Sequence, residues 1–201
     1  MDTNKYTFIV IGGAYQSPQR IEYVKNNITD VFLKFYPNSE IIFLNSHYVF
    51  SVHSLQGLIL STVDHVKDKE NVILVGSSSG AVVAQVISNV PTVSSKVKGL
   101  ILLGYTPITK LFLPKDFRKY LKELNFCKTE RVEMVRGYFD ILACFHKIYH
   151  DSKRIFFEYF SRNEKCANIT YLNLFCGHLG YLDKKNLQIA IQRYFFFEDK
   201  S

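Results

Sequence analysis

Five small residues at positions 76–80, Gly-Ser-Ser-Ser-Gly, separate the apolar segment 71–75 from the apolar segment 81–90. The first segment, NVILV, predicts a buried strand, and the second predicts a helix. The pattern Gly-x-Ser-x-Gly between a strand and a helix is that of a nucleophile elbow, a sharp turn that strains the central residue and exposes its side chain. Ser78 is therefore the predicted nucleophile.

Gly76 and Gly80 lie two residues before and two after Ser78, where the strand and the helix approach each other too closely for a side chain. The N-terminus of the helix would favour negative charge that develops beside Ser78. Two alternatives are a phosphate-binding loop and an ordinary Gly/Ser-rich turn. The first requires Lys after its last glycine, whereas this chain has Ala81.

An elbow of this kind requires an acid after a later strand and a histidine after the last strand, in that order. RVEMVRGYFD predicts a strand, a glycine turn and Asp140, and ITYLNLFCGHLGY predicts a strand followed by His178. Asp140 is expected to hold Nδ1 of His178, whose Nε2 then takes the proton of Ser78. Taken singly, each of the two is equally well explained as an ordinary loop residue.

Other ionisable residues are weaker candidates, because Asp151, His146 and His150 follow helical rather than strand sequence. Stabilising an oxyanion requires two backbone N–H groups. We expect one from Ser79 and the other from the loop after the first strand, with Ala14 as its donor. In that loop, Gly12 and Gly13 allow the backbone to come close to a reacting carbonyl, although a simple strand-to-helix turn explains them equally well.

The elements that must position these residues alternate along the chain. Six short runs with nearly continuous apolar character predict strands that are buried on both faces of a parallel sheet: 6–11, 40–44, 71–75, 97–103, 131–135 and 169–174. Apolar residues at helical spacing mark 21–32 and 55–66, and Ser17-Pro18 suits the start of the first helix. The fold class predicted is α/β: a three-layer sandwich with an about six-stranded, mostly parallel sheet and helices on both faces.

Residues 1–201 predict a single domain, because 47% hydrophobic content at this length supports one substantial core. Two insertions, at about 105–130 and 141–166, are expected to form small cap segments over the carboxyl edge of the sheet, where such folds bind ligands. Their aromatic, Lys and Arg residues suit the apolar rim of an acyl site. Ordinary amphipathic cover helices are the simpler interpretation.

The net charge of +7 is uneven, because residues 105–201 contain 17 of the 25 Lys and Arg but 11 of the 18 Asp and Glu. A Lys-rich solvated face is the simplest interpretation, and an anionic substrate or a peripheral lipid surface is the alternative. No motif indicates nucleic-acid binding. Without a run of about 18 apolar residues or a leader sequence, we expect a cytoplasmic protein.

The four cysteines show no CxxC pairing, so we expect reduced thiols and no metal site. Cys176 lies two residues before His178, where a buried apolar role is the simpler interpretation and a lining role at the site is the alternative.

Residues 8–195 resemble a compact serine hydrolase of the α/β-hydrolase superfamily. The order Ser78, Asp140, His178 is that of the superfamily, and IGGA at 11–14 stands where its His-Gly-x oxyanion segment normally lies. GSSSG replaces the commoner Gly-His-Ser-x-Gly, and Gly12 replaces the histidine of many members. The chain begins at what is usually the third strand of the superfamily, which implies a minimal, six-stranded parallel sheet.

The resemblance implies hydrolysis of an ester, thioester or lipid-acyl bond through a covalent acyl-serine, without a cofactor. The expected partner is a small-molecule or lipid acyl substrate. Two alternatives stay open: a hydrolase-fold binding protein with little turnover, and an acyltransferase or cofactor-free lyase on the same scaffold, because a fold does not fix the acceptor of the acyl group. The sequence predicts no oligomeric state.

Overall fold

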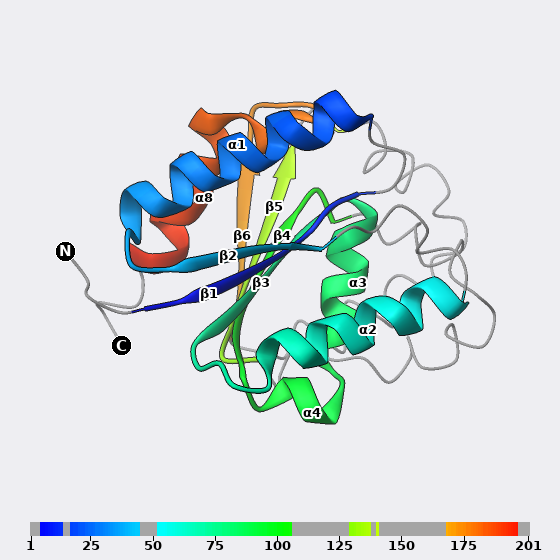
Figure 1. Ribbon diagram of the computed structural model, residues 1–201. Helices are drawn as coiled ribbons and strands as arrows, with labels where there is room; N and C mark the ends of the chain where they lie inside the picture. The colour runs from blue at the N-terminus through cyan, green and yellow to red at the C-terminus, as the bar shows by residue number, and fades with distance from the viewer. Residues whose placement is uncertain are drawn as a thin grey trace, which may run out of the picture.

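A six-stranded parallel sheet forms the centre of the protein (Figure 1). The computed structural model describes residues 5–13, 17–44, 52–105, 129–137, 140 and 168–196, to which every structural statement refers. The strands lie in the order β2-β1-β3-β4-β5-β6. Their bounds are β1 Thr7–Ile11, β2 Glu40–Leu44, β3 Val72–Ser77, β4 Val97–Leu103, β5 Arg131–Gly137 and β6 Ile169–Leu174.

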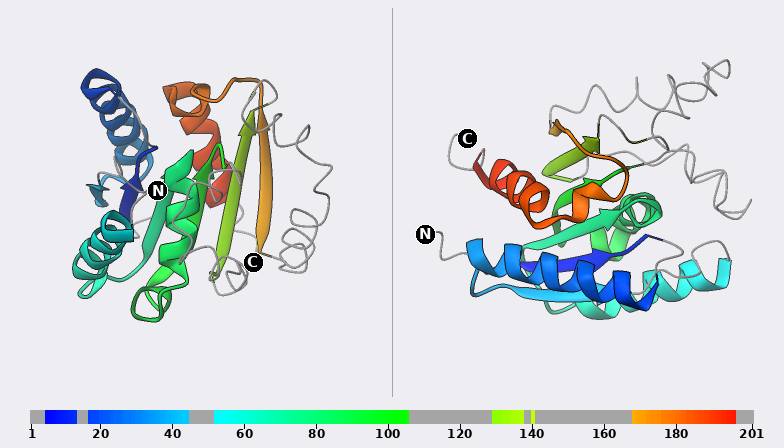
Figure 2. Two further views of the ribbon diagram at one scale, coloured as in Figure 1. Left: turned by 90° about the vertical axis from the view of Figure 1, so that its right-hand side faces the viewer. Right: turned by 90° about the horizontal axis from the view of Figure 1, so that it is seen from above.

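Helices cover both faces of the sheet, as the two views in Figure 2 confirm. On one face lie α1 (Pro18–Phe35) and α8 (Lys184–Phe196), and on the other lie α2 (Val52–Val66), α3 (Ser79–Ser88) and α4 (Pro91–Ser94). Alternate side chains of each buried strand pack into one of two separate hydrophobic clusters, one under each helical layer. The predicted three-layer α/β fold is confirmed.

All six predicted strands are present, but their burial differs from the prediction. Strands β1 and β3 are buried along their whole length. Strand β2 is only half-buried throughout, and β6 is half-buried over much of its length. The prediction that all six are buried on both faces is therefore wrong for these two, because each lies at an edge of the sheet with one neighbouring strand.

The predicted helices are also present. Ser17 caps α1, because its Oγ accepts a hydrogen bond of 3.2 Å from the backbone N–H of Arg20, and Pro18 is the first helical residue. The structure adds α8, the short α4 and a turn of 3-10 helix, η2 (Gly180–Leu182), which the sequence patterns did not predict. Within the described part of the chain, no helix has the length and apolarity needed to cross a membrane.

The strand order reverses beside β1, because the chain passes from β1 to β2 on one side and returns to form β3 on the other. Ligands of open parallel sheets bind outside the carboxyl ends of the strands at such a reversal. Ile11 pairs with Gly76, so the loop after β1 and the turn after β3 lie side by side there. Of the expected cap segments at about 105–130 and 141–166, residues 106–128 and 141–166 lie outside the described residues, so their cap role stays a prediction.

Candidate active site

Ser78 lies at the turn between β3 and α3 with φ 54° and ψ −120°. Few residues other than glycine adopt positive φ, so the turn holds Ser78 in a strained conformation. Two backbone hydrogen bonds support it: the N–H of Ser78 donates to the carbonyl of Leu103 at 2.9 Å, and the N–H of Ala81 donates to the carbonyl of Ser78 at 3.0 Å. The side chain of Ser78 is half-buried at the carboxyl end of the central strand β3.

The two glycines of the elbow lie where side chains would not fit. A Cβ on Gly76 would clash with Cα of Ala81 and lie 2.6 Å from the carbonyl oxygen of Gly80. On Gly80, a Cβ would clash with the carbonyl oxygens of Ile11 and Gly12 and lie 2.9 Å from the carbonyl carbon of Gly12. Gly80 therefore allows the loop after β1 to pack directly against the elbow.

His178 follows β6, and its Nε2 lies 2.9 Å from Oγ of Ser78. Side chains of α1 fix the segment that carries this histidine. Arg20 donates a hydrogen bond of 3.0 Å to the carbonyl of Leu179, and the buried Asn27 donates one of 2.9 Å to the carbonyl of Leu182. The segment that carries His178 is thus held by α1, in the helical layer on one face of the sheet.

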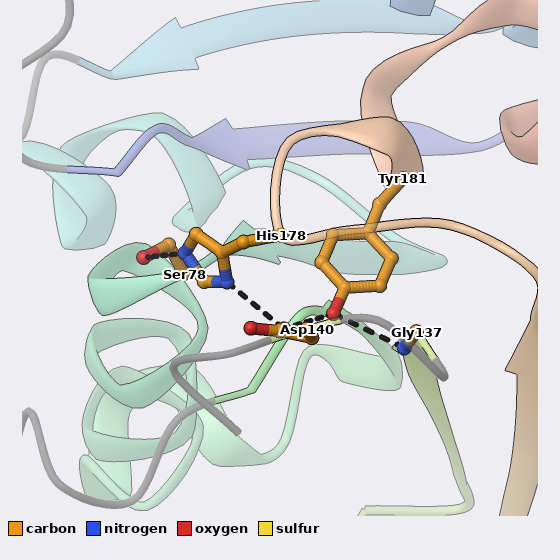
Figure 3. A network of polar contacts seen from close by, with 5 residues as sticks. All are labelled: Ser78, Gly137, Asp140, His178 and Tyr181. Atoms are coloured by element: carbon orange, nitrogen blue, oxygen red, sulfur yellow. Dashed lines mark hydrogen bonds and ion pairs between the residues drawn. The ribbon is translucent and has the colours of Figure 1, made fainter. Parts of the chain in front are cut away.

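Asp140 completes a chain of hydrogen bonds that begins at Ser78 (Figure 3). Its Oδ2 lies 2.9 Å from Nδ1 of His178, and its side chain is fully buried. The residue follows β5, and its N–H donates to the carbonyl of Gly137 at 3.2 Å. A buried carboxylate beside Nδ1 favours the tautomer in which Nε2 is free to accept a proton, and it stabilises the imidazolium that follows.

Tyr181, on η2, belongs to the same cluster but was not singled out by the sequence analysis. Its hydroxyl donates a hydrogen bond to Oδ2 of Asp140 and accepts one of 3.1 Å from the N–H of Gly137. Burial, then the hydrogen bond to Asp140 and the charge of that carboxylate, raise the pKa of Tyr181 well above its ordinary value. The hydroxyl therefore remains a donor at all pH values of interest.

The residues of the predicted oxyanion hole are only partly within the described structure. Ser79 is buried as the first residue of α3, so its position suits the first donor. Gly12 and Gly13 follow β1, and the carbonyl of Gly12 lies against Gly80 of the elbow. Ala14, the expected second donor, lies outside the described residues, and its role stays a prediction.

Cys176 is half-buried beside the site. Burial raises the pKa of its thiol, and the carboxylates of Asp140 and Asp183 raise it further, which favours the neutral thiol over the thiolate. Among the described residues, no three His, Cys, Asp or Glu side chains are grouped to hold a metal ion. The competing candidates Asp151, His146 and His150 lie outside the described part.

The topology has counterparts among solved structures. An esterase of Pyrococcus furiosus matches with a TM-score of 0.62 at 13% identity, over 96% of this chain and 82% of that chain. The chain has the α/β-hydrolase fold. Est1E from Butyrivibrio proteoclasticus matches with a TM-score of 0.63 at 12% identity, over 100% and 90% of the two chains. A pyrethroid hydrolase from Sphingobium faniae matches with a TM-score of 0.58 at 12% identity, over 98% of each.

The similarity to these α/β-hydrolase structures is one of fold, since the identities are low. No family model and no curated protein matches this chain by sequence.

Proposed function

We propose that the protein is a serine hydrolase that cleaves a carboxylic ester, thioester or lipid-acyl bond through an acyl-Ser78 intermediate. The observation that carries the proposal is the continuous chain of hydrogen bonds from Oγ of Ser78 through both ring nitrogens of His178 to Asp140, with 2.9 Å at each step. The strained φ of 54° at Ser78 adds support, because strain of this kind gathers at reacting residues.

In the acylation step, Oγ of Ser78 attacks the carbonyl carbon of the substrate while Nε2 of His178 takes the hydroxyl proton. Asp140 stabilises the imidazolium through Nδ1 and does not itself become protonated. The tetrahedral intermediate then collapses, the bond to the leaving group breaks, and His178 returns the proton to the leaving oxygen or sulfur. The product of this half-reaction is an ester of Ser78.

In the deacylation step, His178 takes a proton from water, and the resulting hydroxide attacks the acyl-serine. Collapse of the second intermediate releases the carboxylic acid and returns the proton to Ser78. The oxyanion in each step would be stabilised by the N–H of Ser79 and by the loop after β1, where Ala14 is the proposed donor. The positive end of α3 supports the same charge.

An apolar acyl group is the substrate feature that the surroundings of His178 suit best. Phe175 and Leu179 lie within three residues of His178 and expose 81% and 57% of their surface. Exposed large apolar side chains near a reactive centre favour contact with an apolar ligand. The names of the neighbouring structures, an esterase and a pyrethroid hydrolase, fit a hydrolase.

Turnover of p-nitrophenyl butyrate tests the proposal. We expect an initial burst of about one p-nitrophenolate per protein when deacylation is slower than acylation, and a mass increase of one butyryl group on quenched protein. Ser78→Ala should show neither. Folded protein without turnover of activated esters would contradict the proposal and favour a binding role. Butyryl transfer to an added alcohol or thiol in preference to water would instead identify an acyltransferase.

A further inference from the structure

We propose that Tyr181 is a positioning residue of this site, which orients the Asp140 carboxylate and limits how strongly Asp140 stabilises protonated His178. The inference deepens the proposed function and rests on it where turnover is concerned. The relationship between the three side chains is visible in Figure 3, where the tyrosine hydroxyl and the imidazole approach the same carboxylate.

One carboxylate oxygen receives both donors. Oδ2 of Asp140 accepts a hydrogen bond from the hydroxyl of Tyr181 and lies 2.9 Å from Nδ1 of His178. The direction of the tyrosine hydrogen bond is fixed, because the backbone N–H of Gly137 donates to the same hydroxyl oxygen at 3.1 Å. The hydroxyl must therefore present its proton to Asp140, and the carboxylate shares its charge between two donors.

Glycines at the carboxyl ends of two neighbouring strands lie beside this tyrosine, and one of them makes room for its ring. Gly104 follows β4 with φ 61°, and a Cβ there would clash with the Tyr181 ring, lying 2.9 Å from Cδ2. A Cβ on Gly137, the last residue of β5, would clash with the carbonyl oxygen of Cys176 and lie 3.2 Å from the Tyr181 hydroxyl oxygen. The ring is 2% exposed and lies edge-on to the His178 ring at a centroid distance of 6.0 Å.

The consequence for proton transfer has a definite sign. Because the Asp140 carboxylate accepts a hydrogen bond from the Tyr181 hydroxyl, it is a weaker acceptor for the N–H at Nδ1 of His178. It therefore stabilises the imidazolium less. Without that hydroxyl, the imidazolium form would persist to higher pH, and only neutral His178 can take the proton of Ser78. The carboxylate would also lose one of the contacts that hold its plane, so the base would be less well aligned.

The test compares Tyr181→Phe with Tyr194→Phe. Tyr194 is the matched control, because it is also 2% exposed and packs over a glycine of β4, Gly99, at the opposite end of that strand. We measure kcat/KM against pH, the melting temperature, and the 1H–15N spectrum of protein labelled at histidine. Tyr181→Phe should lower kcat about tenfold, shift the acid limb of kcat/KM to higher pH and move the Nδ1 proton resonance of His178 downfield. Tyr194→Phe should leave the acid limb and the resonance unchanged.

A second variant covers the case in which Tyr181→Phe does not fold. Incorporation of 3-fluorotyrosine at position 181 keeps the ring and the hydroxyl but makes the hydroxyl a stronger donor. The acid limb should then shift to lower pH and the Nδ1 resonance upfield, opposite in sign to the effects of the phenylalanine variant.

The outcomes separate this inference from the proposed function. If wild type turns over esters while both Tyr181 variants leave the acid limb and the resonance unmoved, the inference is wrong and the function stands. If wild type does not turn over but the resonance moves as stated, the function is wrong and the positioning of Asp140 by Tyr181 stands. An unmoved resonance in an inactive protein contradicts both.

Discussion

Nε2 of His178 lies 2.9 Å from Oγ of Ser78, although 100 residues separate the two along the chain. The contact is made over the carboxyl edge of the sheet, because the serine follows β3, the histidine follows β6, and β4 and β5 lie between those strands. The loop after β6 must therefore reach back over two strands. Hydrogen bonds from Arg20 and Asn27 of α1 fix that loop, so the helical layer as well as the sheet sets the distance.

Asp140→Asn should lower turnover by about 10⁴-fold while the protein remains folded. The asparagine side chain keeps an oxygen for the donors that meet at Oδ2 but loses the negative charge that stabilises the imidazolium of His178. Steady-state kinetics on an activated ester, together with circular dichroism, checks this. The control is Asp151→Asn, which should have nearly wild-type activity. An inactive Asp151→Asn beside a nearly neutral Asp140→Asn would show that the acid has been assigned to the wrong residue.

Gly80→Ala should lower both stability and activity, because its Cβ would clash with the carbonyl oxygens of Ile11 and Gly12 and push the loop after β1 away from the elbow. Overpacking of this kind typically costs about 1–3 kcal/mol. The control is Gly57→Ala on α2, where a Cβ meets nothing within 4 Å. That variant should gain about 0.5–1 kcal/mol from the helix propensity of alanine. We compare the two variants by melting temperature and kcat/KM. Equal changes in both variants would contradict the close packing of the loop after β1 against Gly80.

The strands, their order of appearance and the elbow could be predicted from sequence because each depends on local pattern. Short apolar runs bounded by glycine, such as 71–75 before Gly76, carry their own signal. Asp140 and His178 could then be predicted because each stands shortly after a predicted strand, in the order that an elbow requires. The pairing of edge strand β2, half-buried throughout, was less predictable, because the number of neighbours of a strand is a property of the whole sheet.

Tyr181 and α8 mark the limit of that reasoning. Tyr181 reaches Asp140 with its ring packed against Gly104, where a Cβ would clash, and with its hydroxyl beside Gly137 of a different strand. The sequence alone does not indicate that a tyrosine three residues after His178 contacts Asp140, because that contact depends on how the strands pair. Helix α8 has an apolar face that packs on α1 and the sheet. The sequence analysis did not predict it, although Asp183, directly before Lys184, is of a residue type that caps helices.

Glu133 should make stability depend on pH in a direction opposite to that of most carboxylates. Its side chain is fully buried on β5, and burial raises its pKa despite the hydrogen bond from Thr170 and the positive charges of Arg193 and Arg131. The folded protein therefore binds the proton more tightly than the unfolded chain does. The contribution of Glu133 to stability is complete at pH values below the pKa that its carboxyl has in the unfolded chain. It is lost as the pH rises through the pKa that the same carboxyl has in the folded protein.

Glu133→Gln isolates this effect, because glutamine has the same shape and does not titrate. The melting temperature of the variant minus that of wild type should rise as the pH is raised from about 4 to 7. Thermal unfolding at several pH values measures the difference. A difference that falls with pH would mean that the ion pair of Glu133 with Arg193, at 3.4 Å, outweighs the burial of the charge.

Activity on p-nitrophenyl esters should rise from acetate toward octanoate, because the acyl chain is proposed to contact the exposed side chains of Phe175 and Leu179. Leu179→Ser should reduce the ratio of octanoate to acetate kcat/KM while acetate turnover changes little. Ile189→Ser is a suitable control, since Ile189 is also exposed but belongs to α8. A flat or falling chain-length profile in wild type would argue against an apolar acyl substrate.

Labelling with a fluorophosphonate tests the central claim most directly, because these probes phosphonylate only a serine activated by a neighbouring base. The modified residue is located by peptide mass spectrometry, with Ser78→Ala as the control. The account predicts one adduct per chain, on Ser78, and none on the variant. Folded wild-type protein that takes up no probe, or an adduct on another residue, would contradict the assignment of Ser78 as the nucleophile.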